Sequence, residues 1–310
     1  MTPHRIAVVL LVSIAACGGT SGETSGSGGS TAASGESAES STSTTGSGGG
    51  YQTYTLEMDP FVVEPHEEVF KCQNFKNPFG EDVDVVRFES HMTAGSHHLL
   101  LFHGDEYAEA PLVDCSGLEF APTLYGAQKA DNEVRFPEGV AALLEASNGF
   151  RINSHYFNTT GQAITAQVRI TLEIAAPGTV EHHAGVLWAL NPNIYVMPNS
   201  EQVVSESCSI PFDMNVIQAV SHMHSHATHF EASVGGQMLY ETDSWAEPEP
   251  AFFDPARPLA GGDTLTYACS YVNNTSQPLI FGESAGNNEM CIMTAAFYPV
   301  PEGATTVTCD

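Results

Sequence analysis

The sequence predicts an all-β protein built from two antiparallel β-sandwich domains. Short runs rich in Val, Ile, Leu, Phe and Thr recur from Tyr51 onward, separated by Gly, Pro, Asn and Asp. This spacing is typical of antiparallel sandwiches rather than of alternating strands and helices. A break at Ala175-Ala176-Pro177-Gly178 divides the runs into two halves, so we expect domains at 51–176 and 177–310.

The clearest candidate strands are Glu68–Phe70, Val83–Phe88, His98–Phe102, Ala166–Ile174, Val186–Leu190, Asn215–Val220, Thr264–Tyr271 and Ile292–Tyr298. The segment Gly139–Ser147 is the one good helical candidate, because it is rich in Ala and Leu. We detect no sequence repeat between the halves. Asn158-Thr159-Thr160 and Asn273-Asn274-Thr275 match glycosylation acceptors, to which we assign no role.

The N-terminal segment has the pattern of an export signal. A basic start (His4, Arg5) precedes an apolar run, Ile6–Ala16, that is too short to span a membrane. Small residues directly before Cys17 resemble the lipobox of bacterial lipoproteins. We therefore expect a signal peptide at 1–16 and a lipid anchor at Cys17 that holds the exported chain to the bacterial envelope. The alternative is an ordinary secretory signal that leaves Cys17 as a free thiol.

Residues 17–50 are almost entirely Gly, Ser, Thr, Ala and Glu, which cannot form a core. They predict a flexible tether with a reach of roughly 30 Å. The chain as a whole carries 37 acidic residues against 9 Lys plus Arg, a net charge of -28. This charge argues against a nucleic-acid partner, since phosphate binding needs clustered cations, and it suits the capture of metal cations.

The most distinctive stretch is Ser221–Phe230, which holds four histidines. On an extended strand His222, His224 and His226 would share one face, and His229 would lie on the other. A His-x-His pair of this kind can bind one metal ion. The alternative interpretation is a histidine-rich surface strand that binds no metal.

Three further motifs bear on a metal: His97-His98 before an apolar run, His155 followed by Tyr156, and Met290 between Glu289 and Cys291. Each motif alone is weak evidence for a metal site. Adjacent histidines on a regular strand point to opposite faces, so His97 and His98 share an ion only if the strand bulges.

The order and spacing of these motifs together resemble the copper type II, ascorbate-dependent monooxygenase family, which includes peptidylglycine α-hydroxylating monooxygenase and dopamine β-monooxygenase. The resemblance extends over Phe61–Cys309. It implies that the two β-sandwich domains are jelly-roll-like and face each other across a cleft. It implies two copper ions in separate sites. The first, in the N-terminal domain, would be bound by His97, His98 and His155 and transfer electrons. The second, in the C-terminal domain, would be bound by His222, His224 and Met290 and activate dioxygen.

The resemblance also implies a cysteine pairing. The bonds would be Cys72–Cys115, Cys208–Cys309 and Cys269–Cys291, which leaves only Cys17 unpaired. Paired cysteines suit an oxidising compartment. The six cysteines alone allow 15 pairings.

The function implied is hydroxylation of a C–H bond in a small organic substrate, with dioxygen and ascorbate or a similar reductant. Peptidylglycine enzymes bind the substrate carboxylate through an arginine, an asparagine and a tyrosine, where this chain has Val220, Ile292 and Thr294. We therefore expect a substrate without a carboxylate anchor, bound by a monomer. Neutral imidazole is needed for ligation, so copper affinity should fall below roughly pH 6. The alternatives are a non-catalytic copper-binding or storage lipoprotein, and a structural surface protein with incidental histidines.

Overall fold

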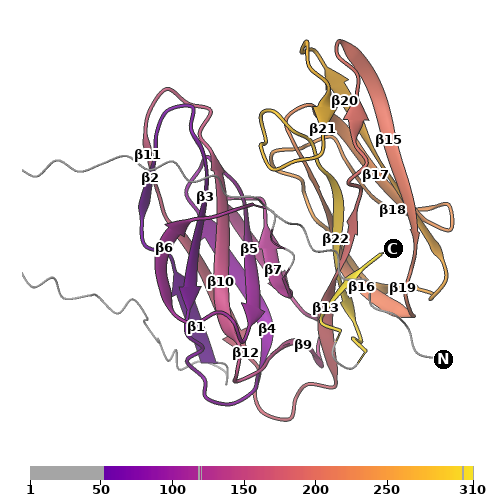
Figure 1. Ribbon diagram of the computed structural model, residues 1–310. Coiled ribbons are helices and arrows are strands. Elements are labelled where there is room, and N and C mark those ends of the chain that lie inside the picture. Colours follow the sequence, from indigo (N-terminus) through magenta and orange to yellow (C-terminus); the bar gives the residue numbers. More distant parts are fainter. Residues whose placement is uncertain (1–51, 118, 120, 302–303, 310) are drawn as a thin grey trace, which may run out of the picture. The chain divides into compact units, whose positions relative to one another are not determined.

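The computed structural model describes residues 52–117, 119, 121–301 and 304–309, and these are all-β, as the sequence predicts (Figure 1). They all belong to one compact unit, residues 40–310. The signal peptide expected at 1–16, the anchor at Cys17 and the tether at 17–50 lie outside the described residues. Within the described ranges, no helix is long and apolar enough to cross a membrane.

The strands fall into two sets that follow one another along the chain. The first set is β1 (Gln52–Glu57), β2 (Phe61–Val63), β3 (Glu68–Phe75), β4 (Val83–Met92), β5 (Ser96–Gly104), β6 (Ala110–Asp114), β7 (Thr123–Ala127), β8 (Asp131–Arg135), β9 (Val140–Leu144), β10 (Gly149–Phe157), β11 (Ile164–Ala166) and β12 (Val168–Ile174). The second set is β13 (His182–Leu190), β14 (Tyr195–Val196), β15 (Ser200–Ser209), β16 (Met214–Met223), β17 (Ala227–Val234), β18 (Gln237–Thr242), β19 (Ala251–Leu259), β20 (Thr264–Asn273), β21 (Leu279–Ile280), β22 (Cys291–Tyr298) and β23 (Thr306–Thr308).

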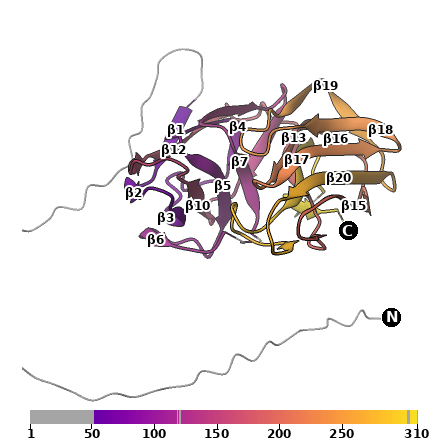
Figure 2. The ribbon, with the colours of Figure 1, turned by 90° about the horizontal axis from the view of Figure 1, so that it is seen from above.

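One large sheet runs through both sets. Its strands follow the order β1-β12-β4-β9-β13-β22-β16-β19, and the parallel pair β9–β13 carries it from the first half into the second. Seen from above, β1, β4, β13 and β16 of this sheet follow one another from the first half to the second (Figure 2). A five-stranded sheet, β6-β3-β10-β5-β7, completes the first sandwich, and a four-stranded sheet, β15-β20-β17-β18, completes the second. The shared sheet therefore joins the two sandwiches by backbone hydrogen bonds.

Each sandwich has its own apolar core. The first cluster includes Phe88 and Ile152, the second includes Phe230 and Met293, and all four side chains are fully buried. The division falls within β13, because Ala184 belongs to the first cluster whereas later residues of that strand belong to the second. The junction expected at 175–178 lies in the connection that leads into β13.

The helix predicted at Gly139–Ser147 is wrong, because this segment contains β9. It pairs antiparallel with β4 on one side and parallel with β13 on the other. Four of its five residues are buried. Its short apolar run suits a strand that is enclosed on both faces, so tertiary pairing overrides the helical propensity of Ala and Leu.

The structure contains a repeat that the sequence analysis missed. The amide of Asn158 donates to the carbonyl oxygens of Val63, Glu64 and Gln162 at 3.2, 3.0 and 2.8 Å. Its oxygen accepts from the backbone N–H and hydroxyl of Thr160.

Asn273 makes the same five contacts in the second half, with Val196, Met197, Gln277 and Thr275. The shared pattern is Asn-x-Thr-x-Gln. Both asparagines are buried and fully hydrogen-bonded, so these potential glycosylation acceptors are structural turns.

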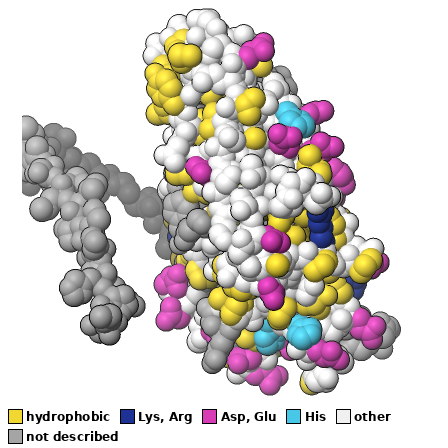
Figure 3. Space-filling view, turned by 90° about the vertical axis from the view of Figure 1, so that its right-hand side faces the viewer, with side chains coloured by type: hydrophobic (Ala, Val, Ile, Leu, Met, Phe, Trp, Pro, Cys, Tyr) yellow, Lys and Arg dark blue, Asp and Glu magenta, His cyan; other side chains and the backbone are white. Residues whose placement is uncertain are grey.

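The disulfides are those that the resemblance implies. Cys72–Cys115, Cys208–Cys309 and Cys269–Cys291 have Cα–Cα distances of 5.8, 5.4 and 5.9 Å. On the face of the molecule in Figure 3, acidic side chains are widely spread whereas Lys and Arg show at few places, in keeping with the net charge of -28.

Candidate metal centre

A bulge in β5 brings His97 and His98 into one group. Along the β5–β10 ladder His98 pairs with His155, but the next pair is Ser96 with Tyr156, so His97 is the extra residue. A bulge turns the side chains of its two residues away from strict alternation. The two rings lie 5.2 Å apart, and this meets the condition that the sequence set for a shared ion.

His155 is fixed by neighbours on two sides. Its ring stacks on Phe70 with centroids 3.9 Å apart, and its Nε2 lies 2.9 Å from Glu68 Oε1. Nδ1 of His155 is buried and has no hydrogen-bond partner among the described residues, and the same holds for Nε2 of His97 and Nδ1 of His98. Buried polar atoms without partners are rare in proteins. Each of the three histidines also offers one ring nitrogen to a group whose nitrogens lie within 4.8 Å of one another, so the trio fits a metal ion.

The expectation that His222, His224 and His226 share one strand face is wrong. β16 ends at Met223, and the chain turns before β17 begins at Ala227. His226 and His229 point elsewhere: Nε2 of His226 contacts the carbonyl of Gly286, and Nδ1 of His229 lies 2.6 Å from the Asp243 carboxylate. Neither belongs to the groups of described residues that could hold a metal ion.

His222 and His224 nevertheless face each other, with their Nε2 atoms 3.3 Å apart. Two imidazole nitrogens bound to one tetrahedral ion at about 2.0–2.1 Å lie about 3.3 Å apart. Nδ1 of His222 contacts Gln128 Oε1 at 2.7 Å, and Nδ1 of His224 contacts the Asn288 carbonyl at 3.2 Å. Both Nδ1 atoms therefore act as donors, which leaves both Nε2 lone pairs free for a metal.

The two histidine sets lie together, contrary to the separate sites that the resemblance implies. The ring of His222 lies 4.8 Å from that of His97 and 4.8 Å from that of His98. His97 belongs to both possible trios, one with His98 and His155 and one with His222 and His224. The five rings form a single cluster, which we call the histidine cluster.

Burial keeps the histidine cluster neutral. Desolvation, followed by repulsion from the neighbouring imidazoles, holds the pKa of His97, His98 and His222 well below the ordinary value. Desolvation also lowers the pKa of His155, against the raising effect of Glu68, and lowers the pKa of His224 to about 4. Neutral imidazole is the form that ligates metals.

Two acidic side chains hold the loops of the cluster in place. Glu289 is fully buried and accepts the backbone N–H groups of His224 and His226 at 3.2 and 2.7 Å. Burial raises the pKa of the Glu289 carboxyl to about 8, despite the backbone donors that lower it. Glu68 on β3 accepts from Ser284 Oγ and from the backbone N–H of Ala285, and so ties His155 to the second half.

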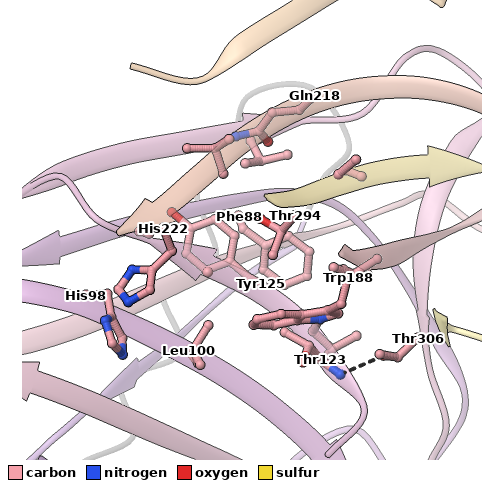
Figure 4. Close-up of a pocket in the computed structure, with 18 of the residues that line it drawn as sticks. Phe88, His98, Leu100, Thr123, Tyr125, Trp188, Gln218, His222, Thr294 and Thr306 are labelled. Carbon is pink, nitrogen blue, oxygen red and sulfur yellow. Dashed lines mark hydrogen bonds between the residues drawn. The ribbon is translucent and has the colours of Figure 1, made fainter. Parts of the chain in front are cut away.

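A cavity of about 420 Å³ opens beside the cluster, lined by residues of both sandwiches. His98 and His222 lie at one end of the view in Figure 4, next to Leu100. Met290 also lines the cavity and is buried, and its carbonyl accepts a hydrogen bond from Tyr271 at 3.0 Å. Every residue expected to bind metal thus lies in the histidine cluster or in the wall of the adjoining cavity.

Sequence reasoning missed Gln128 and Glu68. Both stand in unremarkable contexts, and each acts on a histidine far away in the chain, so no local signal marks them. Glu289 was quoted only as part of the motif around Met290; its neighbours in the sequence do not reveal that it is buried.

No family model and no curated protein matches the sequence. Among solved structures the STIV MCP matches with a TM-score of 0.37 and 9% identity, over 80% of this chain and 97% of that one. The major capsid protein of bacteriophage PM2 matches with a TM-score of 0.31 and 8% identity, over 81% and 99%. PNGase F, a glycosylasparaginase from Flavobacterium meningosepticum, matches with a TM-score of 0.31 and 8% identity, over 80% and 91%. Likenesses at this level bear on neither family nor function.

Proposed function

We propose that the protein is a copper-dependent monooxygenase that hydroxylates a C–H bond of a small organic substrate with dioxygen and ascorbate or a similar reductant. The observation that carries the proposal is the histidine cluster beside a cavity that Met290 also lines. The resemblance in motif order is the second support.

His97, His98 and His155 would hold one copper ion, and His222, His224 and Met290 the other. Bound copper would supply one-electron chemistry with dioxygen at this place. Imidazole and thioether suit an ion that cycles between Cu(I) and Cu(II), because the soft sulfur favours the reduced form. His97 lies within reach of both groups, so the proposed sites adjoin.

The chain's own residues prepare this site in three ways. Gln128 and the Asn288 carbonyl accept from the Nδ1 atoms of His222 and His224 and aim both Nε2 atoms at one point. Burial keeps the imidazoles neutral and excludes water from their ligating nitrogens. The cavity wall would hold the substrate next to His98 and His222.

The alternative is a copper-storage protein that uses the same ligands. Storage needs no substrate space, whereas this cluster adjoins a cavity of about 420 Å³, within the usual range for small-molecule sites. The cavity therefore favours catalysis.

Copper stoichiometry, followed by ascorbate-dependent oxygen uptake with a panel of small aromatic and aliphatic compounds, tests the proposal. We expect two copper ions per chain and uptake that depends on substrate. His222→Ala should abolish uptake, whereas His229→Ala, at a surface histidine outside the cluster, should leave it intact. Two bound copper ions without substrate-dependent uptake would support storage, and a chain that binds no copper would contradict both functions.

Export and a lipid anchor at Cys17 belong to the same proposal. The three disulfides support an oxidising compartment, which is where such bonds persist. Cys17→Ser should release the protein from membranes without a change in copper binding. If the variant stays with membranes, the anchor lies elsewhere.

A further inference from the structure

The wall of the cavity is apolar and aromatic along most of its length. Phe88, Tyr125 and Trp188 present rings to it, and Leu100 lies near the histidines (Figure 4). The rings of Phe88 and Tyr125 are stacked with centroids 5.3 Å apart. Flat apolar molecules pack well against such walls, because aromatic faces combine a large contact area with little loss of side-chain entropy.

The charged side chains of the wall are already engaged. Lys129 and Glu119 are the only Lys, Arg, Asp or Glu residues among the described lining residues. Lys129 pairs with Glu249 at 2.5 Å, and Glu119 accepts from Arg151 at 2.9 Å and from Tyr107 at 2.8 Å. A charged ligand would give up its hydration in this cavity and would find no free side chain of opposite charge. This uncompensated loss of hydration costs free energy.

Gln218 supplies a polar point at a distance from the histidines. It shares β16 with Val220 and His222, and all three line the cavity, as alternate residues of a strand do. Four strand residues span about 13 Å, so Gln218 lies about this far from His222 along the strand. The Gln218 side-chain amide and the nearby Thr294 hydroxyl make no hydrogen bond to any described residue. The Thr306 hydroxyl of the same cavity wall is already engaged, because its Oγ1 accepts from the backbone N–H of Thr123 at 2.8 Å.

We infer that the substrate is a neutral, mostly aromatic molecule with one hydrogen-bonding group, which Gln218 binds while the apolar body extends along β16 toward His222. This inference rests on the proposed function for the identity of the reacting end, but the binding it predicts needs no turnover. The same walls disfavour carboxylates and amines alike.

Three ligands of one shape test the charge preference: 2-naphthylmethanol, 2-naphthoate and 2-naphthylmethylamine. Their affinities are measured by calorimetry at pH 7 on copper-loaded and metal-free protein. We expect the neutral alcohol to bind at least about tenfold more tightly than either ion. A tenfold difference in affinity corresponds to about 1.4 kcal/mol of binding free energy. Equal or tighter binding of an ion, or no binding by any of the three, overturns the inference. Copper stoichiometry from the same samples tells this failure apart from a failure of the proposed function.

Two variants locate the binding. Gln218→Leu should lower the affinity for 2-naphthylmethanol about tenfold and leave the affinity for 2-methylnaphthalene unchanged, because only the alcohol loses a hydrogen bond. Thr294→Trp places a bulky indole in the cavity near Gln218 and should weaken the binding of both ligands at least about tenfold, whereas the same substitution at exposed Val203 should not. If Thr294→Trp retains normal copper loading and wild-type affinity for the alcohol, the ligand binds elsewhere and the inference is wrong.

Discussion

The side-chain oxygen of Gln128 lies 2.7 Å from Nδ1 of His222, although the two residues belong to different halves of the chain. The amide nitrogen of Gln128 donates to the Ser221 carbonyl at 2.5 Å, which fixes the orientation of the amide. The oxygen must therefore accept from Nδ1–H, and Nε2 of His222 keeps its lone pair toward His224. A side chain of the first half thus determines the tautomer of a proposed ligand in the second.

Gln128→Leu should weaken metal binding at His222 and His224 by about 10–100-fold, as is usual when the partner of a ligating histidine is lost. Titration of metal-free protein with copper measures the affinity, and circular dichroism checks the fold. Gln237→Leu, at an exposed residue of β18, is the matched control and should bind copper with normal affinity. Wild-type affinity in Gln128→Leu would show that the cross-half contact does not position His222.

The free energy of unfolding of the metal-free protein should fall as the pH drops below about 6.5. The pKa of His97, His98 and His222 lies well below the ordinary value in the folded state, so below pH 6.5 the unfolded chain binds more protons. Each such group contributes a slope of about 1.4 kcal/mol per pH unit.

Glu289 acts in the opposite direction. Its pKa is raised to about 8, so its contribution to the free energy of unfolding is complete below about pH 4.5 and is lost as the pH rises through 8. Because several imidazoles outweigh one carboxyl below pH 6.5, we expect greatest stability near pH 6–7. Chemical denaturation from pH 5 to 8 provides the measurement. A stability that is the same at pH 5 and pH 7 would mean that the imidazoles are not held neutral by burial.

The strands and the histidine motifs could be read from the sequence, because each depends on local pattern. All eight candidate strand runs lie wholly or largely within strands, since alternation and Gly or Pro boundaries act over a few residues. The bulge at His97 was a stated condition for the first histidine trio, and it is present.

What the sequence could not provide was the meeting of distant segments. The 4.8 Å between the rings of His97 and His222 depends on how the β9–β13 pair joins the two sandwiches. The same pairing makes a strand of Gly139–Ser147, which looks helical in isolation. The repeated Asn-x-Thr-x-Gln turns, by contrast, were visible in the sequence and were missed because the match to glycosylation acceptors hid their structural role.

The two repeated turns give a prediction on stability. Asn158→Ala and Asn273→Ala should each lower the free energy of unfolding by about 1–3 kcal/mol or more, because each change leaves buried carbonyl and N–H groups without hydrogen-bond partners. Asn274→Ala, one residue from a buried asparagine, should have little effect. If Asn158→Ala unfolds at the wild-type denaturant concentration, the turn does not stabilise the first sandwich.

The last prediction separates catalysis from storage at Met290. This side chain is buried in the cavity wall and directly follows Glu289, which holds the backbone of His224. Met290→Ile keeps the approximate volume and removes the sulfur, so the fold should survive at a cost below about 1.5 kcal/mol. His222 and His224 remain, and they should keep Cu(II) loading near the wild-type level.

A storage protein with this change would lose some Cu(I) affinity and nothing else. A monooxygenase would lose nearly all substrate-dependent oxygen consumption, because the thioether that favours Cu(I) is gone. His155→Ala should also abolish turnover, but through the other proposed site, and so it should leave Cu(I) affinity at His222 and His224 unchanged. Copper titration in both oxidation states and oxygen uptake distinguish these cases. Full activity of Met290→Ile on a substrate that the wild type oxidises would show that Met290 is not a ligand.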